Sequence, residues 1–351
     1  MHYHFRHWQT YVLNLSNNPI RGVFTQNLFI SSKLSLKSPK TALLVLALLL
    51  LSSSWNVQAN GKKARAGNRS DAIMLQPSPV IHYARPKIFP GSEEYAGPAD
   101  IWNPDKGFLV QSTNPESYNL NFPTTGAHNL YFDLLISGVD INKLTWEPVT
   151  HEGITATVTN VVANDKWIPH EDKGEVVARV KLTGPEARNQ WDNRNPSRIT
   201  VPKLPQTFEL VGRDIYGVEV VKYGFVLRQW FVNRGGRADE YSNQTTWCNS
   251  LGYRMPRVRD LTNSKCGVES NYFPCISATP SSVHSGYQRR IGAGFFTEWG
   301  DVYFYTVAGF PFGNFWTSDA AGSYQLTVNS TYGYVYSNSD INFRYGVCTA
   351  P

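Results

Sequence analysis

Between residues 81 and 226, apolar and polar side chains alternate with a period of two, and turn residues separate the alternating runs. The alternation is clearest at 130–135, 154–158 and 176–182. Two more runs flank the turn DIYG within 208–222, which predicts a β-hairpin. Because short strands recur at this spacing without a long amphipathic helix, the pattern predicts a β-sandwich.

The pattern changes in residues 227–351, which hold all four cysteines and many Gly, Tyr, Trp and Phe. We expect one helix over 239–251, ended by Gly252, and one or two helical turns over 258–261. The remaining sequence of 227–351 predicts short strands and long loops. The connection at 224–233 is short and apolar, so we expect two domains, 81–226 and 227–351, packed end to end.

Residues 1–59 contain five basic residues and no acidic one. A basic flank, the uncharged run 41–51 and the small residues around Gln58 predict a secretory signal peptide, cleaved after Ala59. The apolar run is about half of the ~20 residues that span a bilayer, and an uncleaved interfacial anchor is the alternative. Residues 60–80 are polar with scattered prolines and predict a flexible segment.

The whole chain has a net charge of +6, which favours nucleic acid or an anionic membrane as a partner. Without residues 1–59, however, 28 basic residues face 27 acidic ones, and this balance excludes nucleic acid. Charged residues make up only 17% and aromatic residues 13%, which argues against disorder and coiled coil. Four cysteines fit two disulfides in an oxidising compartment.

The C-terminal half carries four motifs, WFVNRG (230–235), WCNSLGYRMPRVRDLT (247–262), FWTSDAAG (315–322) and YGVCTAP (345–351). They resemble the C-type-lectin-like module that ends bacterial invasins, intimins and related enterobacterial adhesins. The stretch FELVGRDIYGVEVVKYGF (208–225) looks like the bacterial immunoglobulin-like domains that precede this module. The resemblance implies a mainly β chain, with an immunoglobulin-like β-sandwich followed by a C-type-lectin-like α+β domain.

The cysteine count alone leaves three disulfide pairings open. In the module that the chain resembles, the first and last strands pair, and a helix cysteine is bonded to a cysteine of the last strand. The resemblance therefore implies the pairs Cys248–Cys348 and Cys266–Cys275.

The lectin-like resemblance raises calcium-dependent sugar binding as an alternative, since Ca²⁺ needs several oxygen ligands. Residues 315–319 lack the Trp-Asn-Asp element of such sites, and Glu298 and Asp301 lack a partner motif. The histidines after residue 59 form neither a His-x-x-x-His spacing nor a nucleophile elbow. We therefore expect no metal, no cofactor, no catalytic residue and no enzymatic activity.

Two sets of side chains are candidates for recognition. In the aromatic stretch 295–316, most rings belong in the core, and the loop 309–313 is the first choice for exposed ones, with Phe310 and Phe312. The second set is basic and would contact an acidic receptor or a glycan. Its candidate residues are Arg257, Arg289 and Arg290.

By resemblance, we expect a non-enzymatic, exported bacterial adhesin-like protein that attaches to host or neighbouring-cell surfaces through its C-terminal domain. The expected partner is a surface protein or glycan, an outer-membrane adhesin is a further candidate partner, and the chain is expected to be a monomer. The expected location is the cell surface, or the medium after secretion. The alternative is a periplasmic structural or accessory component of a surface adhesin system, because residues 60–351 show no evident means of staying on the cell.

Overall fold

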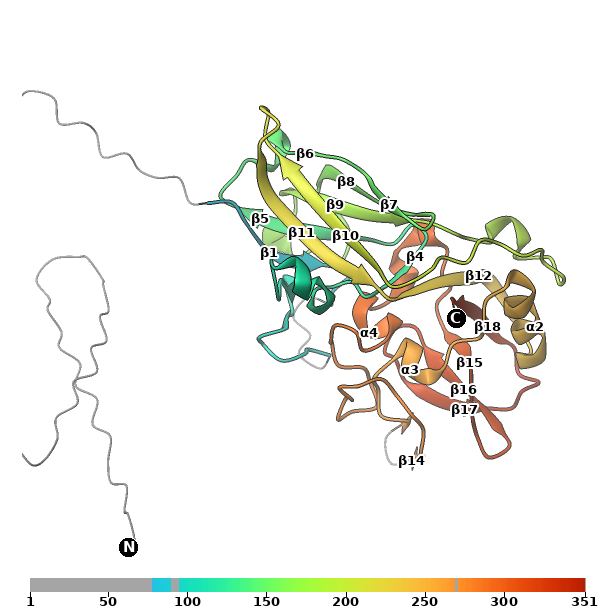
Figure 1. Ribbon diagram of the computed structural model, residues 1–351. Helices are drawn as coiled ribbons and strands as arrows, with labels where there is room; N and C mark the ends of the chain where they lie inside the picture. The colour runs from blue at the N-terminus through green and yellow to red at the C-terminus, as the bar shows by residue number, and fades with distance from the viewer. Residues whose placement is uncertain (1–77, 90–94, 269–270, 351) are drawn as a thin grey trace, which may run out of the picture. The chain divides into compact units, whose positions relative to one another are not determined.

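The computed structural model describes residues 78–89, 95–268 and 271–350, and in these ranges the chain is mainly β (Figure 1). The described residues form one compact unit. The expected signal peptide, its cleavage after Ala59 and the flexible segment up to residue 77 lie outside the described residues. None of the helices in the described ranges is long and apolar enough to cross a membrane.

The first half of the described chain forms two antiparallel sheets. The larger has the strand order β2-β3-β1-β5-β9-β8-β7 and the smaller the order β11-β10-β6. The strands of the larger sheet are β1 (Val80–Arg85), β2 (Trp102–Asn103), β3 (Gly107–Leu109), β5 (Tyr131–Ser137), β7 (Val149–His151), β8 (Ile154–Val162) and β9 (Val176–Thr183). Those of the smaller sheet are β6 (Thr145–Trp146), β10 (Gln206–Arg213) and β11 (Glu219–Leu227).

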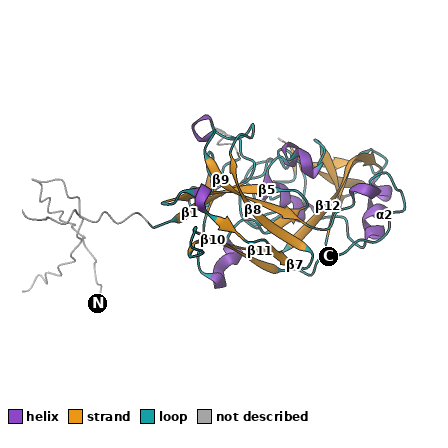
Figure 2. Cartoon of the chain, turned by 90° about the horizontal axis from the view of Figure 1, so that it is seen from above, coloured by secondary structure: helices purple, strands orange, loops and turns teal. Residues whose placement is uncertain are grey.

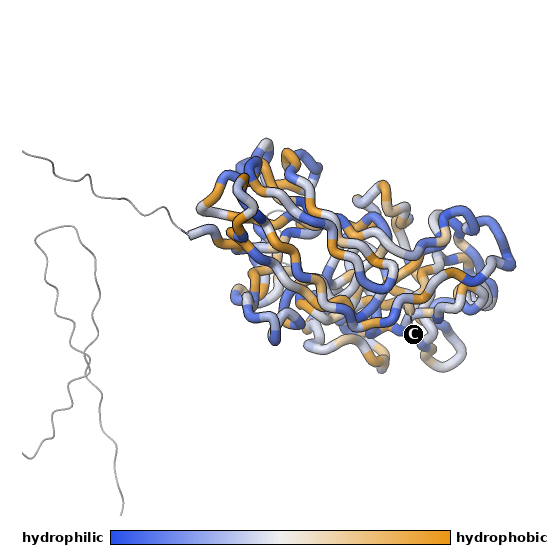
Figure 3. Tube along the Cα trace, turned by 45° about the horizontal axis from the view of Figure 1, so that its top comes forward, coloured by the Kyte–Doolittle hydropathy of each residue, from blue (hydrophilic) through white to orange (hydrophobic). Residues whose placement is uncertain are grey.

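The two sheets enclose one apolar core, as the period-two pattern predicts. Phe132 of β5 is fully buried, and its ring lies 6.1 Å from that of Phe225 in β11 of the facing sheet. Phe208 of β10 stacks on Phe225 at 5.2 Å, and the predicted hairpin is the β10–β11 pair. Figure 3 shows orange, hydrophobic segments interspersed with white and blue ones through the body of the tube, and mostly blue, hydrophilic loops at its right-hand end. The alternation therefore marks the buried faces of a β-sandwich.

The second half is built on a six-stranded sheet with the order β17-β16-β15-β18-β12-β4. Its strands are β4 (Thr125–Ala127), β12 (Gln229–Asp239), β15 (Asn314–Ala321), β16 (Tyr324–Asn329), β17 (Val335–Asn338) and β18 (Arg344–Thr349). A separate small hairpin joins β13 (Gly267–Val268) to β14 (Asn271–Tyr272). The helices are α2 (Tyr241–Leu251), α3 (Val258–Leu261) and α4 (Phe295–Trp299). Figure 2 shows α2 at the end of the molecule opposite to β1.

The helix expected over 239–251 begins two residues later, at Tyr241, because Asp239 is the last residue of β12. The carboxylate of Asp239 accepts a hydrogen bond from the side chain of Asn243, in the first turn of the helix, at 2.8 Å. The helix ends before Gly252, whose φ of 87° suits glycine, as predicted. The expected turns at 258–261 are α3.

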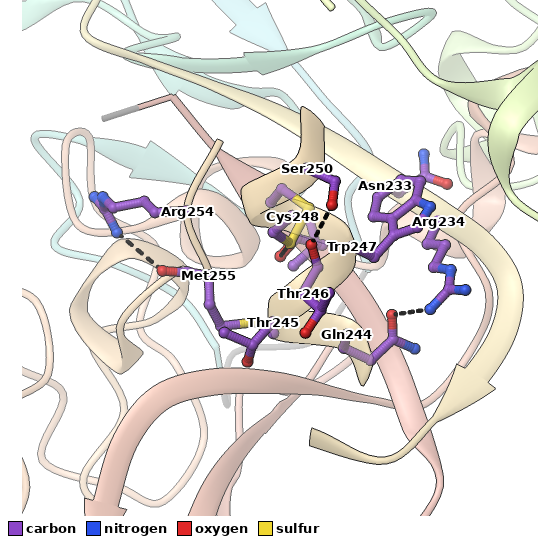
Figure 4. Close-up of a disulfide and its surroundings, with 12 residues drawn as sticks. Asn233, Arg234, Gln244, Thr245, Thr246, Trp247, Cys248, Ser250, Arg254 and Met255 are labelled. Atoms are coloured by element: carbon purple, nitrogen blue, oxygen red, sulfur yellow. Dashed lines mark hydrogen bonds between the residues drawn. A yellow bond between two sulfur atoms is a disulfide. The ribbon is translucent and has the colours of Figure 1, made fainter. Parts of the chain in front are cut away.

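The cysteines of the described chain pair as the resemblance implies. Cys248 of α2 is bonded to Cys348 of β18, with Cα atoms 5.4 Å apart, and Cys266 is bonded to Cys275. Figure 4 shows the first bond beneath α2, beside Trp247. β18 also pairs with β12, so this bond fastens α2 to the strand that closes the module.

The connection expected at 224–233 is almost entirely strand. β11 ends at Leu227 and β12 begins at Gln229, so only Arg228 lies between them. β4, a segment of the first half, pairs in parallel with the start of β12 and becomes the edge strand of the second half's sheet. The two halves therefore share a sheet as well as a short connection.

Glu298 of α4 fastens β4 to the second half. Its fully buried carboxylate accepts hydrogen bonds from the backbone N–H groups of Thr124 (3.1 Å), Thr125 (2.9 Å) and Gly292 (2.8 Å). The hydroxyl groups of Thr124 and Thr125 donate as well, at 2.9 and 2.5 Å. Burial raises the pKa of Glu298, while these hydrogen bonds oppose the rise. The junction is therefore held by a buried carboxylate with five donor groups.

Candidate recognition surface

Two exposed aromatic rings touch each other at the surface of the second half. Phe312 follows the turn at Gly309 and is 56% exposed, and Tyr303 of the short 3₁₀ helix η5 (Val302–Phe304) is 50% exposed. Their ring centroids lie 6.2 Å apart in an edge-to-face arrangement. The half-buried ring of Phe304 contacts Tyr303 on one side and Trp167 of the first half on the other. We call Tyr303, Phe304 and Phe312 the aromatic patch, and it lies over the junction between the halves.

Phe310, the other aromatic candidate of this loop, is buried. Its ring is 3% exposed and lies 5.6 Å from Phe295 and 6.4 Å from Phe315, so it belongs to the core of the second half. The prediction that Phe310 is an exposed recognition residue is therefore wrong, because its ring fills the space between two core aromatics. Phe312 remains exposed, as expected of that loop.

Arg289, a basic candidate, is also buried, with 1% of its surface exposed. Its guanidinium donates to the backbone carbonyls of Lys87 (2.6 Å), Thr297 (3.2 Å) and Glu298 (2.8 Å), and it lies 4.6 Å from the ring centroid of Trp102. These carbonyls replace water around the charge, so Arg289 joins the two halves. The expectation that it contacts a partner is wrong.

Of the other basic candidates, Arg257 is exposed and Arg290 is half-buried. Arg257 precedes α3, and the N–H of Val258, the first residue of α3, donates a hydrogen bond to the carboxylate of Asp319, late in β15, at 2.7 Å. Phe312 lies just before β15 begins. Arg257 and the aromatic patch are therefore near opposite ends of β15, and the structure does not gather the predicted residues into one site.

Tyr303 and Phe304 are the patch residues that the sequence did not single out. They stand in the run Tyr303-Phe304-Tyr305, and nothing in this run distinguishes an exposed ring from a buried one. Tyr305 is fully buried, and its hydroxyl oxygen accepts a hydrogen bond from the Lys87 N–H at 2.6 Å. Tyr305 also packs on Tyr131 of the first half and on Trp299 of the second, so tertiary contacts distinguish the two tyrosines.

Two buried titratable side chains, Lys87 and Asp301, lie beneath the patch. The amino group of Lys87 lies 4.8 Å from the ring centroid of Phe304 and has no hydrogen-bond acceptor. Burial and the neighbouring guanidinium of Arg289 lower the pKa of Lys87 to about 6, although Asp301 partly opposes this. Asp301 accepts a hydrogen bond from the Thr331 hydroxyl at 3.0 Å, and burial raises its pKa. Glu298 and Asp301, considered above as calcium ligands, are thus engaged with protein donors.

Replacing Lys87 with Met should stabilise the protein near neutral pH. The folded state has the lower lysine pKa, so between pH 6 and about 10 the unfolded chain binds more protons and stability rises with pH. A methionine removes this dependence, and at pH 7 we expect Lys87→Met to raise the free energy of unfolding by on the order of 4 kcal/mol. Urea unfolding between pH 6 and 9 measures both effects.

Lys203→Met is the matched control, since Lys203 is exposed. The lowered pKa of Lys87 would be refuted if wild type and Lys87→Met gained stability equally as the pH rises.

In the described ranges, no group of three or more His, Cys, Asp or Glu side chains is arranged to hold a metal ion.

No family model and no curated protein matches the chain. Among solved structures, it is similar to invasin, described as a bacterial integrin-binding protein, with 13% identity and a TM-score of 0.43, over 78% of this chain and 39% of that one. It is similar to a 282-residue C-terminal fragment of intimin, solved with the intimin-binding domain of the translocated intimin receptor, with 10% identity and a TM-score of 0.40, over 78% of this chain and 65% of that one.

A third likeness is to an intimin fragment of enteropathogenic E. coli, with 12% identity and a TM-score of 0.34, over 78% of this chain and 99% of that one. The chain spans 39% of the length of the invasin structure that it matches. These likenesses are to the same invasin and intimin family that the C-terminal motifs of this chain resemble.

Proposed function

We propose that this chain is an exported, non-enzymatic adhesin-like protein that binds a protein on a host or neighbouring cell through the aromatic patch. The observation that carries the proposal is the pair of touching rings, Tyr303 and Phe312, each at least half exposed on a disulfide-closed module. Aromatic side chains bury a large area at a low cost in conformational entropy and dominate protein contacts. The invasin-like and intimin-like motifs of 230–351 support the same role.

The surroundings of the patch suit binding without rearrangement. Phe304 packs between Tyr303 and Trp167, and Asp301 accepts the N–H of Tyr303 at 3.2 Å, so the base of the patch is fixed. A rigid base lowers the entropy that association must overcome. We favour a protein as the partner of the two edge-to-face rings, and an outer-membrane adhesin is one candidate protein. A glycan is the alternative partner. Arg257 would act at a separate contact.

The test is the binding of residues 60–351 to cultured cells and to isolated bacterial surfaces, compared with Phe312→Ala and Tyr303→Ala. Loss of either ring should cost about 2 kcal/mol, or roughly 30-fold in the dissociation constant. Both variants should keep the wild-type unfolding temperature, because the truncated rings are at least half exposed.

Phe343→Ala is the matched control, since Phe343 is 60% exposed and lies outside the patch. If both patch variants bound with wild-type affinity, the partner would contact a surface other than the aromatic patch. If the wild-type protein did not bind, the proposed adhesin role would be wrong.

Display on the cell is a separate part of the proposal. Protease added to intact cells should digest the chain if it is exported to the surface, whereas full protection would favour the periplasmic accessory role. A blot against residues 60–351 follows the product in both cases.

A further inference from the structure

A row of tyrosines lies next to the aromatic patch in the second half. Tyr332, Tyr334 and Tyr336 belong to the run STYGYVYS (330–337), which leads into β17. Successive ring centroids lie 5.4 and 6.3 Å apart. Tyr332 is 37% exposed, and the other two rings are half-buried. We call these three residues the tyrosine row.

The backbone before the row is bonded to the loop that carries Phe312. The N–H of Ser330 donates to the carbonyl of Gly313 at 2.9 Å, and the N–H of Gly313 donates to the Ser330 hydroxyl at 3.4 Å. Gly313 directly follows Phe312, and Ser330 precedes Tyr332 by two positions. These two bonds therefore hold Phe312 and Tyr332, both exposed, on neighbouring segments.

A second link joins the row to Tyr303. The Thr331 hydroxyl donates to Asp301 at 3.0 Å, and the same carboxylate accepts the N–H of Tyr303 at 3.2 Å. Thr331 directly precedes Tyr332. One buried carboxylate thus fixes the backbone on both sides of the boundary between the row and the patch.

Ring contacts continue across the same boundary. The ring of Tyr332 stacks on that of Phe89 at 6.5 Å and on that of Tyr95 at 5.6 Å. The amino group of Lys87 lies 2.8 Å from the ring centroid of Phe89 and 4.8 Å from that of Phe304 in the patch. The patch and the row therefore form one aromatic surface, which we call the combined face.

The two segments that carry the combined face have no charged residue. Residues 302–318 and 320–339 contain no Asp, Glu, Lys, Arg or His. Lys87 and Asp301 lie beneath the face and are buried. At its border, Arg188 donates to a backbone carbonyl of the first segment. A charged group of a partner would therefore lose its hydration on this face without gaining an opposite charge.

The composition of 329–339 indicates the kind of partner. Apart from one Thr and one Val, this segment consists of Tyr, Ser, Asn and Gly. Antibody paratopes are enriched in the same four types, since tyrosine supplies contact area at a low entropic cost and short polar side chains supply adaptable hydrogen bonds. A protein interface of standard size takes about 20–30 residues from each partner, so the aromatic patch alone is too small to form one. The tyrosine row supplies part of the missing area.

We propose that the aromatic patch and the tyrosine row together bind a protein whose contact face is itself uncharged. This inference rests on the proposed function, and it adds to that function the extent of the surface and the chemistry of the partner.

Binding of the purified protein to isolated bacterial surfaces and to fixed cultured cells tests the proposal. Tyr332→Ala should weaken binding by about tenfold or more. Tyr324→Ala is the matched control and should keep wild-type affinity, since Tyr324 is 52% exposed and lies at the start of β16, whereas the row follows the end of that strand. Unfolding temperatures report on the folding of both variants.

The charge of the partner is tested by Tyr332→Lys and Tyr332→Glu. Against an uncharged face, both charges should weaken binding to a similar extent, by about tenfold or more. Wild-type affinity should change by less than about threefold between 0.05 and 0.5 M NaCl, because salt screens only charged contacts. A preference for one of the two variants by more than about tenfold, or a larger effect of salt, would mean a charged partner and would overturn the proposal.

The class of the partner is tested on the surface to which the protein binds. Protease digestion of that surface should abolish binding, whereas periodate oxidation of its glycans should leave binding unchanged. The opposite result would identify a glycan as the partner and would contradict the proposal.

The patch variants separate this inference from the proposed function. If Tyr303→Ala and Phe312→Ala weaken binding but Tyr332→Ala does not, the proposed function holds and the extension to the tyrosine row is wrong. If the wild-type protein does not bind, both are wrong.

Discussion

Removal of the Cys248–Cys348 bond by the double change Cys248→Ala and Cys348→Ala is expected to lower the free energy of unfolding by about 4.7 kcal/mol in the chain-entropy treatment of a 100-residue loop. The bond restricts the unfolded chain over almost the entire second half. In the folded state it also fastens α2 to β18, the strand that pairs with β12. Denaturant unfolding of residues 60–351 under non-reducing conditions measures the loss.

The second disulfide provides the matched comparison. Cys266–Cys275 closes a loop of sequence separation 9, for which the same treatment gives about 2.6 kcal/mol. The larger loss should therefore follow removal of Cys248–Cys348. An equal loss, or a larger one for the short loop, would mean that native packing around each bond outweighs chain entropy.

The sandwich could be predicted from the sequence because its signal is local. Phe132 and Leu134 alternate with Tyr131, Asp133 and Leu135, and both are fully buried in β5. The turn at 214–217 sits between two such runs and produces the β10–β11 hairpin. Helix α2 ends at Gly252 for an equally local reason, since glycine adopts positive φ without strain.

β4 could not be predicted in this way. It has three residues, Thr125–Ala127, and no periodic pattern, and it becomes a strand through parallel pairing with β12, about 100 positions later. Strands this short gain their stability from partners distant in sequence. The same distance hides the role of Glu298, which holds β4 across 173 residues.

Tertiary contacts also decide which of the aromatic and basic candidate residues are exposed. Phe310 and Phe312 stand in the symmetrical run GFPFG, and only the neighbours Phe295 and Phe315 decide that the first is buried. Arg289 is adjacent to Arg290 in the sequence, yet carbonyls from both halves surround Arg289 alone. Which member of a pair is exposed is thus a tertiary property, whereas the presence of the cluster is visible in the sequence.

Glu298→Gln is expected to lower the free energy of unfolding by about 3 kcal/mol at pH 7, although it changes only one atom of the side chain. One carboxylate oxygen receives the N–H of Gly292 and the other that of Thr125. An amide nitrogen cannot accept a hydrogen bond, so either orientation of the glutamine sets its NH₂ group against a backbone donor. Denaturant unfolding should show this loss, whereas Glu219→Gln at an exposed position should leave stability nearly unchanged.

The pH dependence of this loss follows from the raised pKa of Glu298. The folded state keeps the proton to a higher pH than the unfolded state, so the contribution of Glu298 to stability is fully present below the unfolded pKa and declines as the pH rises through the folded value. The stability difference between wild type and Glu298→Gln should therefore be larger at pH 4 than at pH 7. A difference that grows with pH would instead mean that the five donor groups outweigh burial and hold the carboxylate ionised, because hydrogen bonds to the charged form lower a pKa.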